Sequence, residues 1–577
     1  MAGMAGIYVG ASGLRAAQEA LNTTAHNLSN INTSGYTRQQ IGYSTAKYFT
    51  IGQNALGSLS YGIGVNISEI RRVRDDFLDR SYRTENGRAA FYESQYEAVE
   101  EVESLFGELH GVSFASSLDE LLQAFNEVAK NPGSTVTRTA LVQSASAFLS
   151  RATSIYEGLL SYQDTLNTKI KKSVARINEL GNTINNLNQQ ISYIESNGES
   201  ANDYRDQRDA ALDELASLID IDYQELPNGR VEVVAEGITF VTGSTVYEIG
   251  TQNIEGTSLL TPVWPQYDNR EVFVVYAEYN SINSNDIGEL KGLLLARGDR
   301  RTNYTDIPVM PERENYQNDA EYEQAMTQYN IDSAYYNKYI DTSVITSTMA
   351  GFDRLINGMV EKINDVFCPE TTVTADDGTE YTILDTDKAS YGMDGTTTGV
   401  EFFSRKYTER YQQQTITVNG QLMSVYVRNN TNTFGNTSLY TLGNLEINDK
   451  ILQDVQNITL NKKNGEEDFA TAEELVTIWD EEFASLNPSK YGKETFQEYY
   501  NSLTSYVGNN GQVLYNMTED QQAMAAELEN KRQEKLGVAS DDELTSMIRY
   551  QNAYNAASRY VTAVSEMLEH LVTSLGR

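Results

Sequence analysis

The chain has 577 residues, 40% of them hydrophobic, so it is long enough and apolar enough to form several packed domains. Its 81 acidic and 44 basic residues give a net charge of −37, which disfavours nucleic acids and anionic membranes as partners because both attract basic surfaces. We expect no membrane span, since no stretch stays apolar over the roughly 18 residues that a span requires, and we expect no secretory leader.

The first 31 residues are predicted to form a helix with a narrow apolar stripe. The stripe repeats every seven residues and consists of Ile7, Leu14, Leu21 and Leu28. Glycines at positions 3, 6, 10 and 13 each destabilise a helix by about 0.5–1 kcal/mol relative to alanine. The helix is therefore expected to be marginal alone and to form against a partner that approaches its small residues closely.

A second helical region follows a Ser- and Gly-rich loop. Residues 74–106 are charged and aromatic with helical spacing. A long apolar seam occupies 159–194, with isoleucines seven residues apart at 170, 177, 184 and 191. Polar residues at 196–200 break the seam, and 204–219 has the pattern of a returning helix. Together these patterns predict an antiparallel helical hairpin with a long first arm and a short second arm.

The middle of the chain changes to short runs of Val, Ile, Thr and Phe separated by Gly, which predicts β-strands. The predicted fold class is therefore multidomain α+β, with a terminal α-helical coiled coil, a long helical-hairpin domain and central β-rich domains. The predicted parts are an N-terminal assembly helix and loop at 1–50, the first part of the helical domain at 51–220, a β-rich segment at 221–285, helices with a polar, Tyr-rich surface insertion (303–337) at 286–367, a second β-rich segment at 368–460, a helical return at 461–536 and a C-terminal coiled-coil helix at 537–577.

The C-terminal segment carries another seam with a period of seven residues. Its a positions from 547 to 575 and its d positions from 550 to 571 are all apolar. Seams at both ends of a chain, where segments normally fray, favour terminal helices that pack together or into an assembly; the alternative is two ordinary core helices. The predicted assembly interface consists of Ile7, Leu14, Leu21, Leu28, Met547, Tyr554, Val561, Leu568 and Leu575.

The sequence offers no catalytic or metal-binding pattern. Its three histidines are far apart, the phosphate-loop and nucleophile-elbow motifs are missing, and the single cysteine, Cys368, excludes an intramolecular disulfide. Neighbouring carboxylates do not indicate an acid–base or calcium site, because a chain with 81 acidic residues contains such pairs by chance. We therefore predict that the protein is not an enzyme and that it uses no cofactor and no metal.

Four stretches form recognisable motifs. The sequence AHNLSNINTSGYTR at 25–38 resembles the N-terminal signature of the bacterial flagellar rod, hook and hook-associated proteins, although that family usually has Pro where Ser34 stands. Within this family, RDDFLDRSYRTEN at 74–86 and DQRDAALDEL at 206–215 resemble segments of the first hook-associated protein. The C-terminal GVASDDEL, followed by RYQNAY, is similar to its C-terminal signature, with Ser540 in place of the usual Leu.

The resemblance implies a structural subunit of the flagellum that joins hook to filament through paired terminal helices. The implied partners are the hook protein, the next hook-associated protein, other copies of the chain in a ring and an export chaperone on the C-terminal helix. The implied location is extracellular, at the hook–filament junction, after type III export. The alternatives are the hook protein or another axial protein, which the isoleucine seam at 170–191 disfavours, and an adhesin or enzyme mounted on flagellar-type helices.

Overall fold

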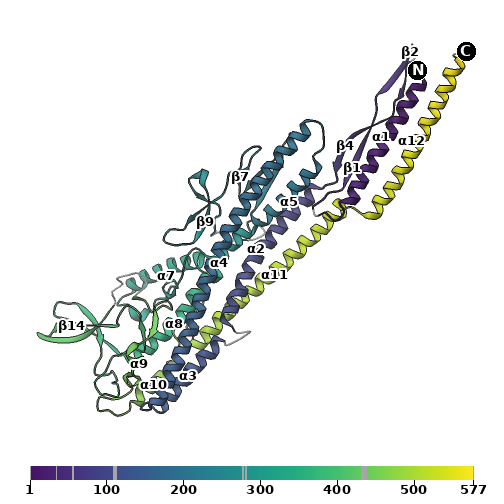
Figure 1. The fold of residues 1–577 in the computed structure, drawn as a ribbon. Coiled ribbons are helices and arrows are strands. Elements are labelled where there is room, and N and C mark those ends of the chain that lie inside the picture. Colours follow the sequence, from purple (N-terminus) through teal and green to yellow (C-terminus); the bar gives the residue numbers. More distant parts are fainter. Residues whose placement is uncertain are drawn as a thin grey trace.

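The computed structural model describes residues 2–33, 35–54, 57–107, 113–275, 279, 283–429, 438–490 and 492–575. The molecule is elongated: long helices follow its main axis, and the two chain ends lie together at one tip (Figure 1). Small β-sheets lie beside the helices along this axis, some next to the chain termini and others toward the opposite end. The predicted multidomain α+β class is confirmed.

Long helices build the part of the molecule that we call the helical body, residues 76–536. Its main elements are α2 (Asp76–Phe106), α3 (Phe114–Lys130), α4 (Thr135–Ser196), α5 (Asn202–Leu218) and α11 (Phe496–Leu536). Helix α11 packs along α2, and α5 folds back on the 62-residue α4 (Figure 1). The predicted helical hairpin is thus confirmed as α4 and α5, and the four seam isoleucines of α4 are fully buried.

Local sequence explains where these helices begin. The side chain of Asp75 accepts the N–H groups of Phe77 and Leu78 at the start of α2. Ser134 caps α4, and Thr495 caps α11 in a capping box. Such side chains satisfy backbone donors that have no partner within the helix.

The remaining helices of the body are shorter. They are α6 (Glu289–Arg297), α7 (Asp319–Tyr339), α8 (Val344–Phe367), α9 (Asp449–Gln453), α10 (Phe469–Thr477) and the single 3-10 turns η1 (Pro265–Tyr267), η2 (Tyr304–Asp306), η3 (Arg313–Asn315) and η5 (Val455–Asn457). Most residues of α6 and α8 are buried.

The strands of the body pair in small antiparallel sheets. One has the order β5 (Ile221–Glu225), β6 (Val231–Ala235), β7 (Ile238–Val241), and a second has the order β10 (Arg270–Glu271), β9 (Leu260–Trp264), β8 (Gly250–Asn253). The third has the order β11 (Glu370–Thr374), β12 (Glu380–Leu384), β15 (Gln421–Arg428), β14 (Tyr411–Val418). The fourth pairs β13 (Phe403–Arg405) with β16 (Leu445–Ile447). Figure 1 shows β14 projecting at the end far from the chain termini.

The described residues within 51–72, a stretch expected to begin the helical domain, lie mostly in strands instead. Strands β1 (Gln39–Thr45) and β4 (Val65–Arg72) pair with each other, and β2 (Tyr48–Asn54) pairs with β3 (Gly57–Gly62). This stretch is rich in Gly, Ser, Thr and Tyr, which favour strands and turns over helix. The four strands form a ribbon beside the N-terminal helix (Figure 1).

The Tyr-rich segment 303–337 also differs from its description as a plain surface insertion. It contains most of α7, whose residues are largely exposed, as expected for an excursion. Tyr336, however, is buried and packs in a small cluster with Ile307, Ile340 and Ala350 of α8. One turn of α7 therefore contributes to the apolar face of its neighbour, which the polar composition of the segment concealed.

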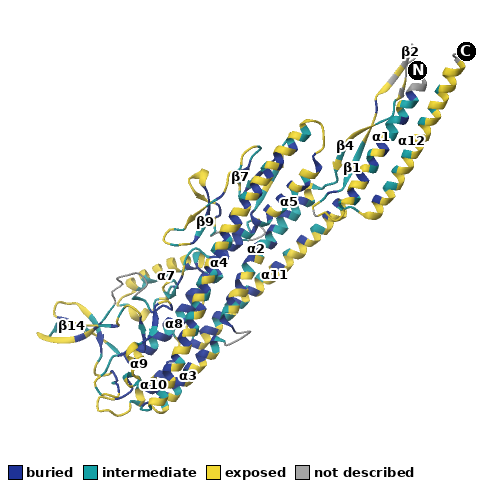
Figure 2. Cartoon of the chain, viewed as in Figure 1, coloured by how far each residue is buried: buried dark blue, intermediate teal, exposed yellow. Residues whose placement is uncertain are grey.

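The core of the body joins α2, α3, α4, α8 and α11. Four aromatic side chains meet at its centre: Phe106, Phe114, Phe352 and Tyr500, with ring centroids 5.0–6.1 Å apart. Figure 2 shows buried positions concentrated in the body and exposed positions along much of the C-terminal helix. Among the described residues, no helix has the length and apolarity needed to cross a membrane.

Candidate assembly interface

The terminal helices α1 (Ala2–Ser29) and α12 (Ser540–Leu575) form an antiparallel pair that extends beyond the helical body (Figure 1). The direction follows from their contacts, since Gly6 faces Val564, Gly13 faces Ala557 and Asn27 bonds to Glu543. We call this unit the terminal pair. Its two helices come from opposite ends of the sequence, as the two apolar seams predicted.

Glycines form the contact line of α1. A Cβ atom at Gly10 would lie 2.5 Å from Val561 Cγ2 and 3.0 Å from Tyr560 Cδ1, which is closer than real Cβ contacts come. At Gly6 the same atom would be 3.3 Å from Val564 Cγ1. The alternating spacing of four and three residues continues through small, buried residues to Asn27: Ala17, Ala20 and Thr24. The two backbones approach closely because this line has almost no side-chain volume.

The residues predicted for the interface lie as follows. On α12, Met547, Tyr554, Val561 and Leu568 are half-buried, and the side chain of Leu575 lies outside the described part. On α1, Ile7, Leu14, Leu21 and Leu28 are also half-buried, each one position after a residue of the small contact line. The structure therefore brings the two helices together, while small residues provide the closest contacts of α1. The spacing of Gly6, Gly10 and Gly13 was the sequence signal for this line.

The terminal pair leaves large apolar side chains open. Ile548, Met567 and Val572 of α12 are 61%, 70% and 67% exposed, and Tyr8 of α1 is 64% exposed. Leu544 and Leu571 are also exposed. Several large apolar side chains exposed on one element indicate an interaction site.

The strand ribbon is attached to α1 at the start of β4. The Val65 N–H donates to Ser12 Oγ at 3.2 Å, and that hydroxyl donates to the Val9 carbonyl at 2.8 Å. Gly64 has φ +114°, and a side chain there would collide with Ser12. The ribbon thus sits against α1 at a position that requires glycine.

Asn27 connects three elements at the base of the terminal pair. Its amide nitrogen donates to the Gln39 carbonyl at 2.9 Å and to Glu543 Oε2 at 3.2 Å. Its Oδ1 accepts from the Gln39 N–H at 3.0 Å and from the Tyr36 hydroxyl at 2.8 Å. Burial, together with nearby carboxylates, raises the pKa of Tyr36, so its hydroxyl keeps the proton that it donates. Asn27 thereby ties α1 to β1 and to α12.

Arg38 is the second connector. Its Nε donates to Glu543 Oε1 at 2.7 Å, its N–H donates to the Leu536 carbonyl at 2.9 Å, and its carbonyl accepts from the Val73 N–H at 2.9 Å. One residue therefore contacts the end of α11, the start of α12 and the end of β4. Glu543, the shared acceptor, is 2% exposed.

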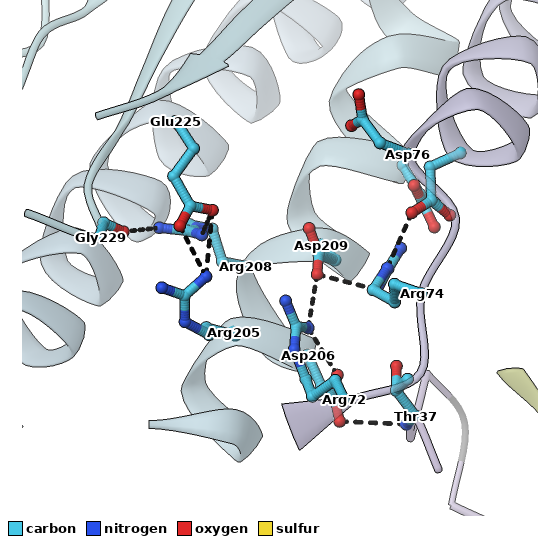
Figure 3. A network of polar contacts seen from close by, with 12 residues as sticks. Thr37, Arg72, Arg74, Asp76, Arg205, Asp206, Arg208, Asp209, Glu225 and Gly229 are labelled. Carbon is cyan, nitrogen blue, oxygen red and sulfur yellow. Dashed lines mark hydrogen bonds and ion pairs between the residues drawn. The ribbon is translucent and has the colours of Figure 1, made fainter. Parts of the chain in front are cut away.

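A buried network then joins this base to the helical body. The Thr37 N–H donates to Asp206 Oδ2 at 3.0 Å, and Arg72 Nη1 donates to Asp206 at 2.7 Å and Asp209 at 2.6 Å. Figure 3 shows Arg72 between the two carboxylates. Burial raises the pKa of Asp206 despite Arg72. Burial would also raise the pKa of Asp209, but the nearby guanidinium groups, led by Arg74, lower it to about 2.

The C-terminal end of α11 closes the network. Arg532 pairs with Asp213 at 2.8 Å and with Asp79 at 3.0 Å, so α11 is bound to both α5 and α2. Arg83 of α2 also pairs with Asp213, at 2.6 Å. The four motif stretches, 25–38, 74–86, 206–215 and 537–544, all meet at this boundary, although Ser34 lies outside the described residues. Asn27, Arg38 and Glu543 belong to these motifs but were missing from the predicted interface, which was drawn from apolar periodicity alone.

The described residues contain no group of three or more His, Cys, Asp or Glu side chains arranged to hold a metal ion. Cys368 is buried, and burial raises the pKa of its thiol to about 12. The features that distinguish this region are therefore surfaces and contacts between elements.

Three family models match the chain. The family model described as "Flagellar hook-associated protein FlgK helical domain" matches residues 99–379. Flagella basal body rod protein matches 7–37, and Flagellar basal body rod FlgEFG protein C-terminal matches 530–574. The two terminal matches cover most of α1 and most of α12.

Flagellar hook-associated protein 1 of Bacillus subtilis (strain 168) is 24% identical over 577 residues, which cover 99% of this chain and 98% of that protein. The chain is thus similar to flagellar hook-associated protein 1 along nearly its whole length, and its residues 99–379 match the helical domain of that family. The protein of the same name from Salmonella typhimurium is 30% identical over 242 residues, which are 41% of this chain and 42% of that protein. This family consists of structural components of the flagellum.

A solved structure has the same fold. It is titled the structure of the flagellar hook junction protein FlgK from Burkholderia pseudomallei, and it matches with a TM-score of 0.50 at 12% identity. The match covers 78% of this chain and 99% of that chain. At this identity the likeness concerns the architecture of the hook-associated protein 1 fold alone.

Proposed function

We propose that this chain is a structural, non-enzymatic subunit that joins the flagellar hook to the filament and assembles through its terminal pair. The observation that carries the proposal is the exposed apolar surface of α12 on a helix pair that extends beyond the body. Burying a large aliphatic side chain contributes roughly 1.5–3 kcal/mol, so several such residues provide a substantial driving force for association. In this proposal 1–50 and 537–577 are the assembly parts.

The comparisons support the same function. The relatives in Bacillus and Salmonella carry the name hook-associated protein 1, and the structural neighbour is called a hook junction protein. The proposed partners are the hook protein on one side, the next hook-associated protein on the other and further copies of the chain in a ring. An export chaperone would cover the apolar face of α12 before assembly.

The proposed location is extracellular, at the hook–filament junction. Two properties suit export of an unfolded chain: the protein needs no disulfide, because Cys368 is its single cysteine, and its net charge of −37 favours solubility. The terminal pair, built from small residues, would form only after export.

The test adds purified protein to isolated hooks and then supplies flagellin. Wild-type protein should bind the hooks and allow filament growth. Val561→Asp places a charge against Gly10 and Met567→Asp places one on the exposed face, so both should abolish binding while thermal unfolding of the body barely shifts. Leu422→Asp is the matched control, because Leu422 is 78% exposed on β15 in the sheet remote from the terminal pair. Normal hook binding by both α12 variants would contradict the proposal.

A further inference from the structure

The contact between α1 and α12 contains little information about register. On α1 the contact line is Gly, Ala and Thr, and its glycines meet Ala557, Tyr560, Val561 and Val564 of α12. A shift of α12 by seven residues, roughly 10 Å, would again place apolar residues against small ones. Something else must select the observed register.

Glu543 interrupts this apolar seam. It occupies the d position immediately before Tyr550, and its carboxylate is buried against α1. Arg38 Nε and Asn27 Nδ2 donate to its two oxygens at 2.7 and 3.2 Å. A buried carboxylate without such partners is strongly unfavourable, so Glu543 fits at this position only.

Asn27 is equally specific for its place. Its amide makes four hydrogen bonds, two as donor and two as acceptor, which is the full capacity of the group. It bonds to both the N–H and the carbonyl of Gln39, as a neighbouring strand would. Aspartate lacks the donors and leucine lacks both kinds of group, so the arrangement needs a carboxamide.

We propose that Asn27, Arg38 and Glu543 form a register lock that selects one alignment of α1 and α12. If α12 moved by seven residues so that Tyr550 took the place of Glu543, the donors of Asn27 and Arg38 would lose their acceptor, and Glu543 would move past the end of α1, away from both partners. The lock lies at the base of the terminal pair, where both helices join the body, so it also fixes which apolar residues face outward. This last consequence rests on the proposed function, whereas the lock itself is a property of the folded chain.

Engineered disulfides can read the register. A Cβ atom at position 13 would lie 3.7 Å from Ala557 Cβ, within the range of about 3.5–4.5 Å that a disulfide requires. The pair Gly13→Cys with Ala557→Cys therefore reports the observed register, and Gly13→Cys with Val564→Cys reports a shift of seven residues. Cys368 is buried with a raised pKa and does not compete.

The reporters are compared in the full-length monomer in a glutathione redox buffer, with thermal unfolding of the body measured alongside. With the lock intact, only the 13/557 pair should cross-link. Glu543→Leu should raise the yield of 13/564 relative to 13/557 by about tenfold or more, because it removes the buried charge that fixes the register. Glu569→Leu, which alters an exposed glutamate on the same helix, should leave the ratio unchanged.

A pair of polar substitutions tests the lock while keeping hydrogen-bonding side chains at both positions. Asn27→Asp faces Glu543 with a second carboxylate and should lower the 13/557 yield, and adding Glu543→Gln should restore much of it. Unchanged 13/557 selectivity in Glu543→Leu, or no recovery in the double variant, would overturn the lock. Hook binding is measured separately: a shifted register that still binds hooks normally would support the lock and contradict the assembly role of the terminal pair.

Discussion

Helices pack through large side chains in the helical body and through small residues in the terminal pair. In the body, large side chains interlock: Phe352 is fully buried between Phe106 and Phe114. In the terminal pair, small residues of α1 bring the backbones together, and the seam of α12 stays half-buried. The body therefore carries its own stability, whereas the terminal pair leaves apolar surface for neighbouring molecules to cover.

The largest expected effect lies in the body. Phe352→Ala removes a ring from the aromatic cluster and should lower the free energy of unfolding by about 3–5 kcal/mol, as large-to-small core substitutions do. Urea denaturation followed by circular dichroism measures the change. Phe77→Ala is the matched control, because Phe77 is 75% exposed on α2 and should change stability little. Equal losses in the two variants would mean that the aromatic cluster does not hold the body together.

The next prediction compares two glycines of the contact line, Gly10 and Gly13. Gly10→Ala places a methyl group against Val561 and should destabilise the terminal pair by about 1–3 kcal/mol, although alanine favours helix. Gly13→Ala meets Ala557 Cβ at an ordinary 3.7 Å and should be neutral or stabilising. Hydrogen exchange of α1 and α12 should rise in the first variant only, with the body unchanged. Faster exchange in both variants would show that the terminal pair does not depend on this close approach.

The smallest effect tests the boundary between the two regions and depends on pH. The pKa of Asp209 is lowered to about 2 in the folded protein, against an ordinary value of 3.8. The ionised carboxylate of Asp209 stabilises the folded protein fully at pH values above its ordinary pKa. This stabilisation is lost as the pH falls from about 4 to 2, because the unfolded chain takes up the proton first. The difference in unfolding free energy between wild type and Asp209→Asn should therefore shrink by about 2 kcal/mol over this range.

Urea titrations of both proteins at several pH values measure this difference. The raised pKa of Asp206 makes the free energy of unfolding depend on pH with the opposite sign. This effect is present in both proteins and largely cancels in the comparison. A difference that stays constant from pH 5 to pH 2 would mean that the guanidinium groups do not lower the pKa of Asp209.

Apolar periodicity was sufficient to predict the helices, because a repeat of seven residues has meaning within a single segment. The isoleucines of α4 identified the long arm of the hairpin, and the seam from Met547 onward identified α12. The motif at 25–38 and those near 206–215 and 537–544 indicated a resemblance to the flagellar hook-associated proteins. Each of these signals is local in sequence, so no partner was needed to recognise it.

Tertiary structure decided which residues of α1 come closest to α12. Periodicity favoured Ile7 and Leu14, but the backbones come closest where side chains are smallest, at Gly6, Gly10 and Gly13. It also decided that Asn27 and Glu543, 516 positions apart, bond to each other. The sequence marked both residues as parts of motifs, but hydrogen bonding between distant segments depends on how the whole chain folds, and no local pattern encodes it.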